Sequence, residues 1–363
     1  MICKIGYGRE TVPEKHQKYA VRIGNDLSVK FDGLKTRLLD NAGFNSYFAT
    51  RKFLKWVKEY DPDVVHLHNL HGYYINLKLL FRYLRETGKP VIWTLHDCWS
   101  FTGHCSHFDL AGCQKWRTGC ESCPLTKAYP ASFGRDRSKK NYAQKKAYFT
   151  GLKDLTVVTP SQWLADLVKQ SYLGKYDVKV IPNGIDIQAF RPTEGSFRQE
   201  NGLQDKRIVL AVASAWSRSK GLCDLYKLAD LLGDEYRVVI VGLKPEQMEK
   251  LPGNITGITR TNNVQQLAHL YTTADVFVNP TYQDTYPTVN LEAQACGTPV
   301  ITYRTGGSVE SVPPEQVVEK GNVEALCEAV KNLDACNVLQ ADYSAQTSFR
   351  KYVNLYRQKE DLR

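Results

Sequence analysis

The sequence predicts an α/β protein with two doubly wound parallel sheets. Short apolar runs rich in Val, Ile and Leu recur along the chain, and amphipathic stretches of helical period separate them. A chain of 363 residues is long enough for two domains, each with its own hydrophobic core. We therefore expect helices on both faces of each sheet, and a ligand in the crevice that the carboxyl ends of the strands face.

The individual elements follow from the alternation of these two patterns. In the first half, we expect strands at residues 2–6, 63–68, 91–95 and 155–159, and helices at 47–60, 72–86 and 161–172. In the second half, we expect strands at residues 207–213, 237–241, 275–279 and 299–303, and helices at 220–232, 263–272, 288–296 and 322–333. A final amphipathic helix is expected at about residues 345–359.

The net charge of +10 is concentrated in the first half of the chain. Residues 1–178 hold 28 Lys and Arg against 16 Asp and Glu, whereas residues 179–363 hold 20 against 22. A basic half could face nucleic acid, an anionic membrane or a phosphorylated substrate. No nucleic-acid-binding motif is present. Binding to nucleic acid is therefore supported by nothing in the sequence except the net charge. The start of the chain lacks the pattern of a signal peptide, which predicts a cytoplasmic protein.

The segment 137–149 combines a basic face with aromatic residues at helical spacing. It is either an interfacial helix at a membrane surface or a solvated helix whose aromatic side chains pack into the core.

The segment 275–310 predicts a nucleotide-sugar pocket. An apolar run ends in a loop that presents Asp284, and Pro287 then opens a helix that carries Glu292. The unpaired N–H groups of a helix N-terminus suit a diphosphate. Ionised carboxylates accept hydrogen bonds and therefore suit sugar hydroxyls.

These motifs resemble those of a known family. The pattern Asp284-x7-Glu292, the run Ala-Cys-Gly-Thr-Pro-Val-Ile and Thr305-Gly306-Gly307 are similar to the signature of the retaining GT-B glycosyltransferases of family 4. Three upstream segments agree: Ile181–Asp186 with Phe190, Thr159–Leu164, and Thr94–Trp99 followed by a cysteine-rich stretch. The resemblance is greatest to the enzymes of bacterial capsular and exopolysaccharide synthesis.

The resemblance implies a domain organisation. It places a Rossmann-like acceptor-side domain at residues 1–178, a Rossmann-like nucleotide-sugar domain at 179–344, and at 345–363 a helix that crosses back onto the first domain. The chain begins at the second strand of the family pattern, so we expect the first strand, its Gly-rich loop and its helix to be missing. The function implied is retaining transfer of a sugar from a nucleoside diphosphate to a lipid-linked glycan. The implied location is the inner membrane surface, where the protein would be peripherally bound. The alternative is a truncated, non-catalytic protein that binds nucleotide or a partner enzyme.

The resemblance also assigns roles to individual residues. Glu292 would bind the ribose hydroxyls, Asp284 the donor sugar, and Lys220 the diphosphate. Arg218 would replace the arginine that the family has where this chain has Ala215, and His96 would lie beside the donor sugar. The remaining donor-side residues are Thr285, Tyr286, Asn183, Gly184, Gly242, Gly306 and Gly307, and the acceptor-side residues are Asn69, His71 and Asp97. The plain alternatives are a turn-forming Asp284, a first-turn Glu292 in solvent, a solvated basic turn at Lys220 and Arg218, and a structural His96.

The cysteine-rich loop, residues 98–124, predicts a structural metal site. Cys105, Cys113, Cys120 and Cys123 lie in a long loop without secondary-structure signals, and four thiolates around zinc would order such a loop. Free thiols and disulfides are the alternatives. Cys98, His104 and His107 are reserve ligands.

Two other patterns resemble metal motifs without predicting a metal site. In the cluster of His66, His68 and His71, the first two share a face only if the strand continues, and the resemblance implies no metal there. The run Asp61-Pro62-Asp63 precedes its strand and is better explained as a turn. The resemblance implies no catalytic metal.

Overall fold

The computed structural model describes residues 3–9, 12–249, 251–333 and 342–360, which form two compact units. Unit 1 comprises the described residues up to Pro160, Leu164–Val180 and those from Asn354 onward. Unit 2 comprises Ser161–Trp163 and the described part of Ile181–Val353. All strand pairings of the named strands in both units are parallel, which confirms the predicted fold class.

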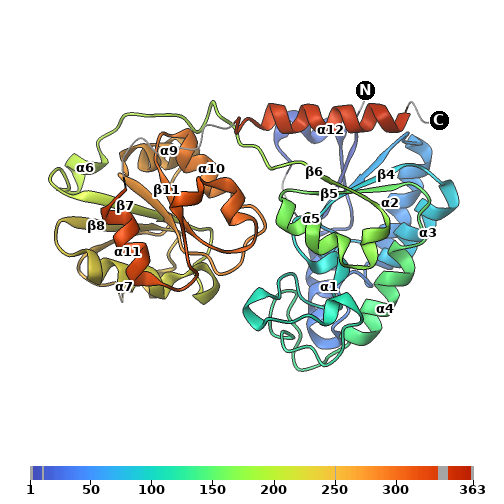
Figure 1. Cartoon of the computed structure of the whole chain (residues 1–363). Coiled ribbons are helices and arrows are strands. Elements are labelled where there is room, and N and C mark those ends of the chain that lie inside the picture. Colours follow the sequence, from blue (N-terminus) through green and yellow to red (C-terminus); the bar gives the residue numbers. More distant parts are fainter. Residues whose placement is uncertain (1–2, 10–11, 250, 334–341, 361–363) are drawn as a thin grey trace. The chain divides into compact units, whose positions relative to one another are not determined.

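Unit 1 contains a four-stranded sheet of order β3-β4-β5-β6 and a separate two-stranded sheet of β1 and β2 (Figure 1). The strands are β1 (Ile5–Tyr7), β2 (Ala20–Arg22), β3 (Val65–Leu67), β4 (Val91–Thr94), β5 (Leu155–Thr159) and β6 (Asp177–Val180). The helices are α1 (Asp26–Leu39), α2 (Tyr47–Tyr60), α3 (Leu77–Thr87), α4 (Ser138–Phe149) and α5 (Gln162–Lys169), whose first two residues belong to unit 2. The expected strand 2–6 thus begins at Ile5 and lies outside the main sheet, and its residue 2 lies outside the described residues.

Aromatic packing joins helices α3 and α4 to the sheet of unit 1. Trp93 of β4 lies with its ring centroid 5.6 Å from that of Phe81 on α3 and 4.8 Å from that of Phe149 on α4. All three side chains are almost fully buried, and Tyr142 of α4 is also buried. The aromatic residues of 137–149 therefore pack inward. The interpretation of this segment as an interfacial helix is wrong, because its apolar side is used by the core.

Unit 2 contains a six-stranded sheet of order β12-β11-β10-β7-β8-β9. The strands are β7 (Arg207–Val212), β8 (Tyr236–Val241), β9 (Ile255–Ile258), β10 (Val276–Asn279), β11 (Val300–Tyr303) and β12 (Val317–Val318). The helices are α6 (Phe197–Glu200), α7 (Leu222–Leu232), α8 (Pro245–Met248), α9 (Val264–Thr273), α10 (Thr288–Ala295) and α11 (Val323–Lys331). The strand order runs outward from β7 through β8 in one direction and from β10 through β11 in the other. The sheet therefore has a topological switch point between β7 and β10.

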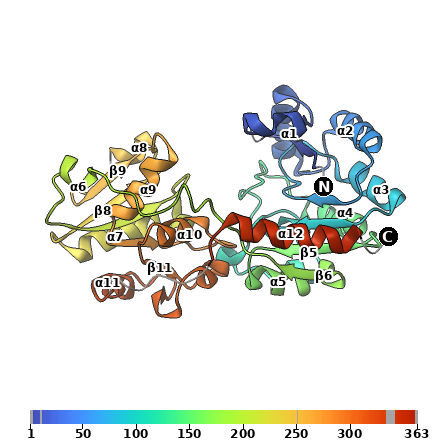
Figure 2. The ribbon, with the colours of Figure 1, turned by 90° about the horizontal axis from the view of Figure 1, so that it is seen from above.

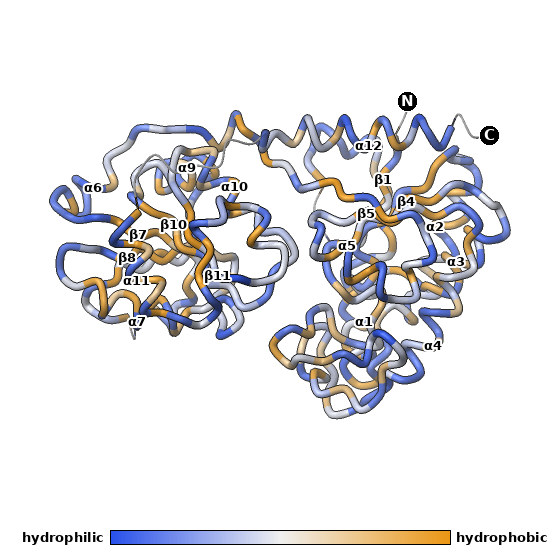
Figure 3. The backbone as a smooth tube through the Cα atoms, viewed as in Figure 1, coloured by the Kyte–Doolittle hydropathy of each residue, from blue (hydrophilic) through white to orange (hydrophobic). Residues whose placement is uncertain are grey.

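Helices cover both faces of this sheet. One buried cluster joins the sheet to α7 and α11, and a second joins it to α9 and α10. Figure 1 shows the strands between these two pairs of helices, and Figure 2 views this unit from the side of α9 and α10. In Figure 3 the hydrophobic colour follows the central strands, whereas the polar colour dominates the outer loops. Strands buried on both faces explain the continuous apolar runs from which the sheet was predicted.

Helix α12 (Ala345–Glu360) contributes to both units. Near its start, Ile185 pairs with Ser344, and Ser348 donates a hydrogen bond to the Pro182 carbonyl at 2.8 Å. Toward its end, Lys359 forms an ion pair with Asp154 in unit 1. Among the described residues, no helix combines the length and apolar character needed to cross a membrane.

The turn at Asp61 is confirmed. Asp61 follows helix α2 in the left-handed conformation, with a φ of 48°, and pairs with Lys89 at 2.6 Å. Asp61 therefore lies in the turn that ends α2, and its carboxylate pairs with a lysine.

Candidate functional site

Unit 2 has a cavity of about 250 Å³ at its switch point. The last residues of β7 and β10, Val212 and Asn279, both line it, as do Thr288 and Val289 in the first turn of α10. No described side chain caps the start of α10, so backbone N–H groups and the positive end of the helix dipole are directed toward this region. We call it the switch-point cavity.

Lys220 and Asp284 form an ion pair in the wall of the switch-point cavity. The Lys220 Nζ lies 2.8 Å from the Asp284 Oδ2, and both residues line the cavity. Lys220 ends a short 3-10 turn after β7, and Asp284 lies in the loop after β10. Asp284 also accepts the backbone N–H of Tyr286 through its Oδ1 at 3.2 Å. The structure thus brings together a cation and a carboxylate that are 64 residues apart in the sequence.

Gly306 and Gly307 support the Asp284 loop from behind. The Gly307 N–H donates to the Asp284 carbonyl oxygen at 3.2 Å. A Cβ on Gly306, whose φ is +50°, would lie 2.0 Å from that same oxygen, and one on Gly307 would lie 1.9 Å from the Thr285 carbonyl oxygen. Only glycine permits this approach of two backbones. The two glycines therefore fix the loop that carries Asp284, and neither is among the residues that line the cavity.

Glu292 lies in the body of α10, and its carboxylate is bound within the protein. Its Oε2 accepts the hydroxyl of buried Tyr271 at 3.0 Å, and the Thr288 hydroxyl donates to it as well. Burial raises the pKa of Glu292 despite these two hydrogen bonds. The alternative of a first-turn Glu292 in solvent is wrong, because α10 begins at Thr288, its first turn has no acidic residue and Glu292 is partly buried.

Of the other predicted donor-side residues, Tyr286 lines the switch-point cavity, whereas Thr285, Arg218, Gly242, Asn183 and Gly184 do not. Exposed Arg218 lies close enough to Tyr282 to lower its pKa, against a larger opposing effect of burial. A Cβ on Gly242 would lie 1.7 Å from the Ala213 carbonyl oxygen, so this glycine permits close packing of the ends of β7 and β8. A Cβ on Gly184 would lie 2.5 Å from the Ala345 Cα, so Gly184 permits close packing against the start of α12.

Sequence reasoning missed Trp216. This side chain is buried, lines the switch-point cavity and donates from its Nε1 to the Val241 carbonyl at 2.8 Å. A tryptophan within the run Ala213–Ser219 was a usable signal, because this run has no other large apolar side chain to fix it.

In unit 1, histidines gather at the carboxyl ends of β3 and β4. The His68 Nδ1 lies 3.0 Å from the His96 Nε2, and the two rings stack at 5.3 Å. His66 lies beside them, with its Nε2 2.8 Å from the Thr94 hydroxyl and its Nδ1 2.6 Å from the hydroxyl of Tyr356 on α12. Burial, followed by the neighbouring imidazoles, lowers the pKa of His66 to about 3 and that of His68 to about 4. Burial also lowers the pKa of His96.

His71 and Asp97 form a second polar pair at this edge. The His71 Nε2 lies 2.9 Å from the Asp97 Oδ2, and its Nδ1 lies 3.2 Å from the Tyr129 hydroxyl. Burial opposes ionisation of Asp97, but His71 and the Trp99 N–H outweigh it and hold the pKa of this carboxyl below its usual value. Asn69 is exposed, and its carbonyl accepts the Tyr74 hydroxyl at 2.6 Å.

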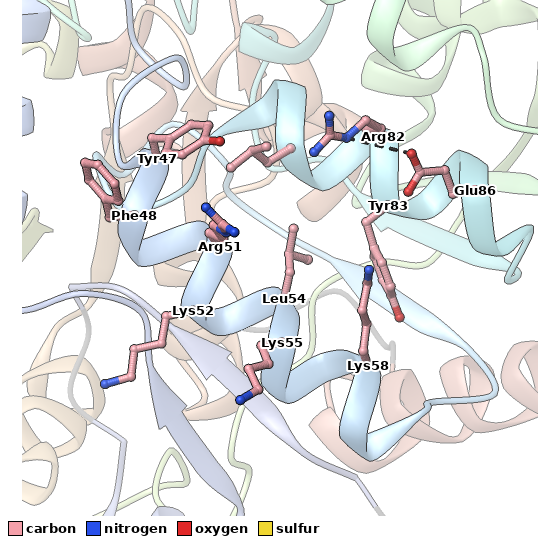
Figure 4. Close-up of a pocket in the computed structure, with 11 residues that line it drawn as sticks. Tyr47, Phe48, Arg51, Lys52, Leu54, Lys55, Lys58, Arg82, Tyr83 and Glu86 are labelled. Carbon is pink, nitrogen blue, oxygen red and sulfur yellow. Dashed lines mark ion pairs between the residues drawn. The ribbon is translucent and has the colours of Figure 1, made fainter.

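A larger cavity of about 780 Å³ lies between α2 and α3 (Figure 4). Its lining is basic: Arg51, Lys52, Lys55, Lys58 and Arg82 contribute side chains, and Glu86 contributes one carboxylate. At the start of α2, Tyr47 is 49% exposed and Phe48 is 82% exposed. No catalytic or donor-binding residue predicted from the sequence lines this cavity.

Two family models match the chain, one in each half. Residues 206–335 match a family model described as glycosyl transferases group 1, and residues 29–189 match one described as glycosyltransferase family 4. The chain contains two glycosyltransferase domains. Over 319 residues, this glycosyltransferase chain is 28% identical to WcaC of Escherichia coli strain K12, a protein named for a glycosyl transferase role in colanic acid biosynthesis. That alignment covers 81% of the chain and 76% of WcaC.

Solved structures support the GT-B fold of these two domains. HepE of Anabaena, in complex with UDP, superimposes with a TM-score of 0.68 at 14% identity, covering 98% of this chain and all of HepE (100%). Sucrose-phosphate synthase of Thermosynechococcus elongatus gives a TM-score of 0.64 at 19% identity, covering 86% of this chain and 78% of the synthase. At such identities the likeness establishes the fold of this glycosyltransferase chain.

Proposed function

We propose that this protein transfers a sugar from a nucleoside-diphosphate donor, bound at the switch-point cavity, to a glycan acceptor in exopolysaccharide synthesis. The observation that carries the proposal is the Lys220–Asp284 pair beside the uncapped N-terminus of α10. HepE has been crystallised with UDP-glucose, which supports a nucleotide sugar as the donor class. The similarity to WcaC supports an exopolysaccharide as the product.

The chemistry of transfer assigns a task to each group. The diphosphate gains negative charge as its bond to the sugar breaks, and a fixed cation at that position lowers the barrier. Lys220 and the N-terminus of α10 supply positive charge without a divalent ion. When a donor enters, Asp284 exchanges part of its contact with Lys220 for hydrogen bonds from sugar hydroxyls. We infer retention of the anomeric configuration, with the departing diphosphate helping to deprotonate the attacking hydroxyl.

The donor proposal is tested with the full chain and a panel of UDP, GDP and dTDP sugars. Thermal shift and calorimetry identify the donor, and release of nucleoside diphosphate in the presence of glycan acceptors measures transfer. NMR of the product assigns the anomeric configuration, and EDTA tests independence of divalent ions. Absence of binding to every donor at millimolar concentration would defeat the proposal. Binding without turnover on any acceptor would instead indicate a non-catalytic nucleotide-binding protein.

We further infer that unit 1 docks on an anionic membrane surface, where a lipid-linked acceptor would be presented. Exposed Phe48 and Tyr47 stand beside Arg51, Lys52 and Lys55, which combines aromatic side chains with positive charge. Sedimentation with vesicles containing phosphatidylglycerol tests this inference. Phe48→Ser should reduce binding, whereas Phe349→Ser, on helix α12 and 63% exposed, is the matched control. Equal binding of both variants, or no binding by the wild type, would contradict the inference.

A further inference from the structure

The cysteine-rich loop between β4 and α4 has little regular structure to hold it. It contains only three short 3-10 turns, Trp99–Phe101, Asp109–Ala111 and Lys115–Arg117. Its apolar core consists mainly of Phe101, Phe108 and Trp116, of which the last two stack with ring centroids 5.1 Å apart. A loop of this length with so small a core needs a further constraint to keep one conformation.

Four thiols of this loop line one very small cavity. The residues are Cys105, Cys113, Cys120 and Cys123, and the cavity has a volume of about 10 Å³. That volume is at the lower limit for a single water molecule, so it suits a bare ion and excludes an organic ligand. All four thiols are free, and the side chains of Cys105 and Cys123 are hydrogen-bonded to each other.

Backbone donors are directed at two of the sulfur atoms. The Gly103 N–H donates to the Cys120 Sγ at 3.2 Å, and the Leu125 N–H donates to the Cys123 Sγ. The position of Gly103 requires a glycine, because a Cβ there would lie 2.3 Å from the Ser138 carbonyl oxygen and 2.7 Å from the Cys120 Cβ. Hydrogen bonds from N–H groups stabilise sulfur as a thiolate more than as a neutral thiol.

A buried lysine next to the loop supplies an independent observation. Lys145 of α4 is 1% exposed, and its Nζ donates to the carbonyls of Trp99 at 2.8 Å and Thr102 at 3.1 Å. Among the described residues, no carboxylate forms an ion pair with this ammonium, whereas Cys105 and Cys120 are its two largest electrostatic neighbours. A buried cation is costly unless negative charge compensates it. A zinc ion with four thiolate ligands carries a net charge of about −2 and would provide that compensation.

We propose that Cys105, Cys113, Cys120 and Cys123 bind one zinc ion as four thiolates. On binding, the four thiols release four protons to solvent and no electron is transferred. As the side chains stand, no three of the described His, Cys, Asp and Glu residues converge at metal-ligand spacing, so binding includes rotation of the thiols toward the cavity. His104 lines the cavity but is not a ligand, because its Nδ1 contacts the Asp40 carboxylate at 2.6 Å and its Nε2 the Ala128 carbonyl at 3.3 Å. Cys98 and His107 are not among the lining residues.

The test begins with metal analysis of the untagged full chain, reduced, incubated with equimolar zinc and freed of excess metal. We expect about one zinc per chain, and four additional thiols that react with a thiol reagent once a chelator is added. Cys113→Ser and Cys120→Ser should each lower the zinc content at least fivefold. Cys223→Ser, at an exposed position on α7, should leave it unchanged. A wild-type content below about 0.1 zinc per chain, or zinc lost equally in the control, overturns the proposal.

A measurement on the wild type avoids variants that fail to fold. X-ray absorption of the zinc-loaded chain should show a shell of four sulfur atoms at about 2.3 Å. Substitution with cobalt should give the intense visible bands of a tetrahedral thiolate site. A zinc shell of nitrogen and oxygen atoms overturns the proposal. So does mass spectrometry that finds a disulfide between Cys105 and Cys123 in the freshly isolated chain.

Discussion

The Lys220 Nζ and the Asp284 Oδ2 lie 2.8 Å apart at the switch point of the six-stranded sheet. Their side chains are 37% and 18% exposed, so water and a ligand can reach the pair. A pair of this kind contributes little to folding when exposed, since screening and side-chain entropy offset the attraction. Its position at the cavity wall, beside a helix N-terminus, supports the proposal that it binds the diphosphate and sugar of a donor.

Replacing Lys220 tests its role at the diphosphate. Lys220→Ala should lower the turnover number by about 100-fold to 1,000-fold, the range for loss of one preorganised donor to a developing charge. Lys227→Ala is the matched control, because Lys227 is exposed on the neighbouring helix α7 and does not line the cavity. Steady-state kinetics with the donor identified by binding are the measurement. Equal turnover of the two variants would remove Lys220 from the mechanism.

Gly306 should tolerate no side chain. Gly306→Ala places a Cβ 2.0 Å from the Asp284 carbonyl oxygen at a φ of +50°, so the Asp284 loop must move. We expect a loss of about 1–3 kcal/mol in the free energy of unfolding, as in overpacked sites, together with weaker donor binding. Gly253→Ala is the control, because a Cβ added at Gly253 would have no heavy atom within 4 Å. Denaturant unfolding and donor titration measure the two effects, and a Gly306 variant as stable as the control contradicts the account.

Glu292 has two roles that one substitution can separate. Glu292→Gln should weaken donor binding at least tenfold if its carboxylate binds the ribose, a loss of about 1.4 kcal/mol. The ionisation of Glu292 changes the free energy of unfolding with pH in a defined direction. Because burial raises the folded pKa of Glu292, its contribution to stability is fully present below the unfolded pKa and is lost as pH rises through the folded value. The wild type should therefore lose stability relative to the variant as pH rises from acid through this window. A variant with unchanged donor affinity and the expected pH effect would leave Glu292 with a structural role alone.

The parts of the fold that were predictable are those with strong local patterns. Strands β4, β5, β7 and β10 are buried on both faces and appear in the sequence as apolar runs. Strands β2, β6, β9 and β12 were not predicted, because they are short and have no long apolar run. Helix α1 was missed for a different reason: Leu27, Phe31, Leu34 and Leu38 follow helical spacing but are exposed, so the pattern does not mark a core.

Site residues were predictable where their chemical type and their place after a strand identify them. They were not predictable where contacts between distant backbone segments fix their positions. The order of Lys220 after β7 and Asp284 after β10 indicated that both lie at the carboxyl end of one sheet. The contact of Gly307 with the Asp284 carbonyl depends on how two loops approach each other, which no local pattern encodes. The same holds for the bond from Tyr271 to Glu292, which joins α9 to α10.

His66 should make the stability of unit 1 depend on pH. Its imidazole contacts the Tyr356 hydroxyl of α12 at 2.6 Å and the Thr94 hydroxyl at 2.8 Å, and it lies beside His68. Because its folded pKa is lowered from about 6.5 to about 3, its contribution to stability is present above pH 6.5 and is lost as pH falls toward 3. His66→Gln keeps a hydrogen-bonding side chain that does not titrate. The wild type should therefore lose more stability than this variant between pH 7 and pH 4.

The comparison of wild type and variant isolates His66 from the other groups that titrate in acid. His68 and His96 face His66 and remain in both proteins, so their contributions cancel to first order. Urea unfolding at several pH values, followed by tryptophan fluorescence, gives the two free-energy curves. Parallel curves would show that folding does not lower the pKa of His66. The burial of its ring against α12 would then have no effect on the stability of unit 1 in acid.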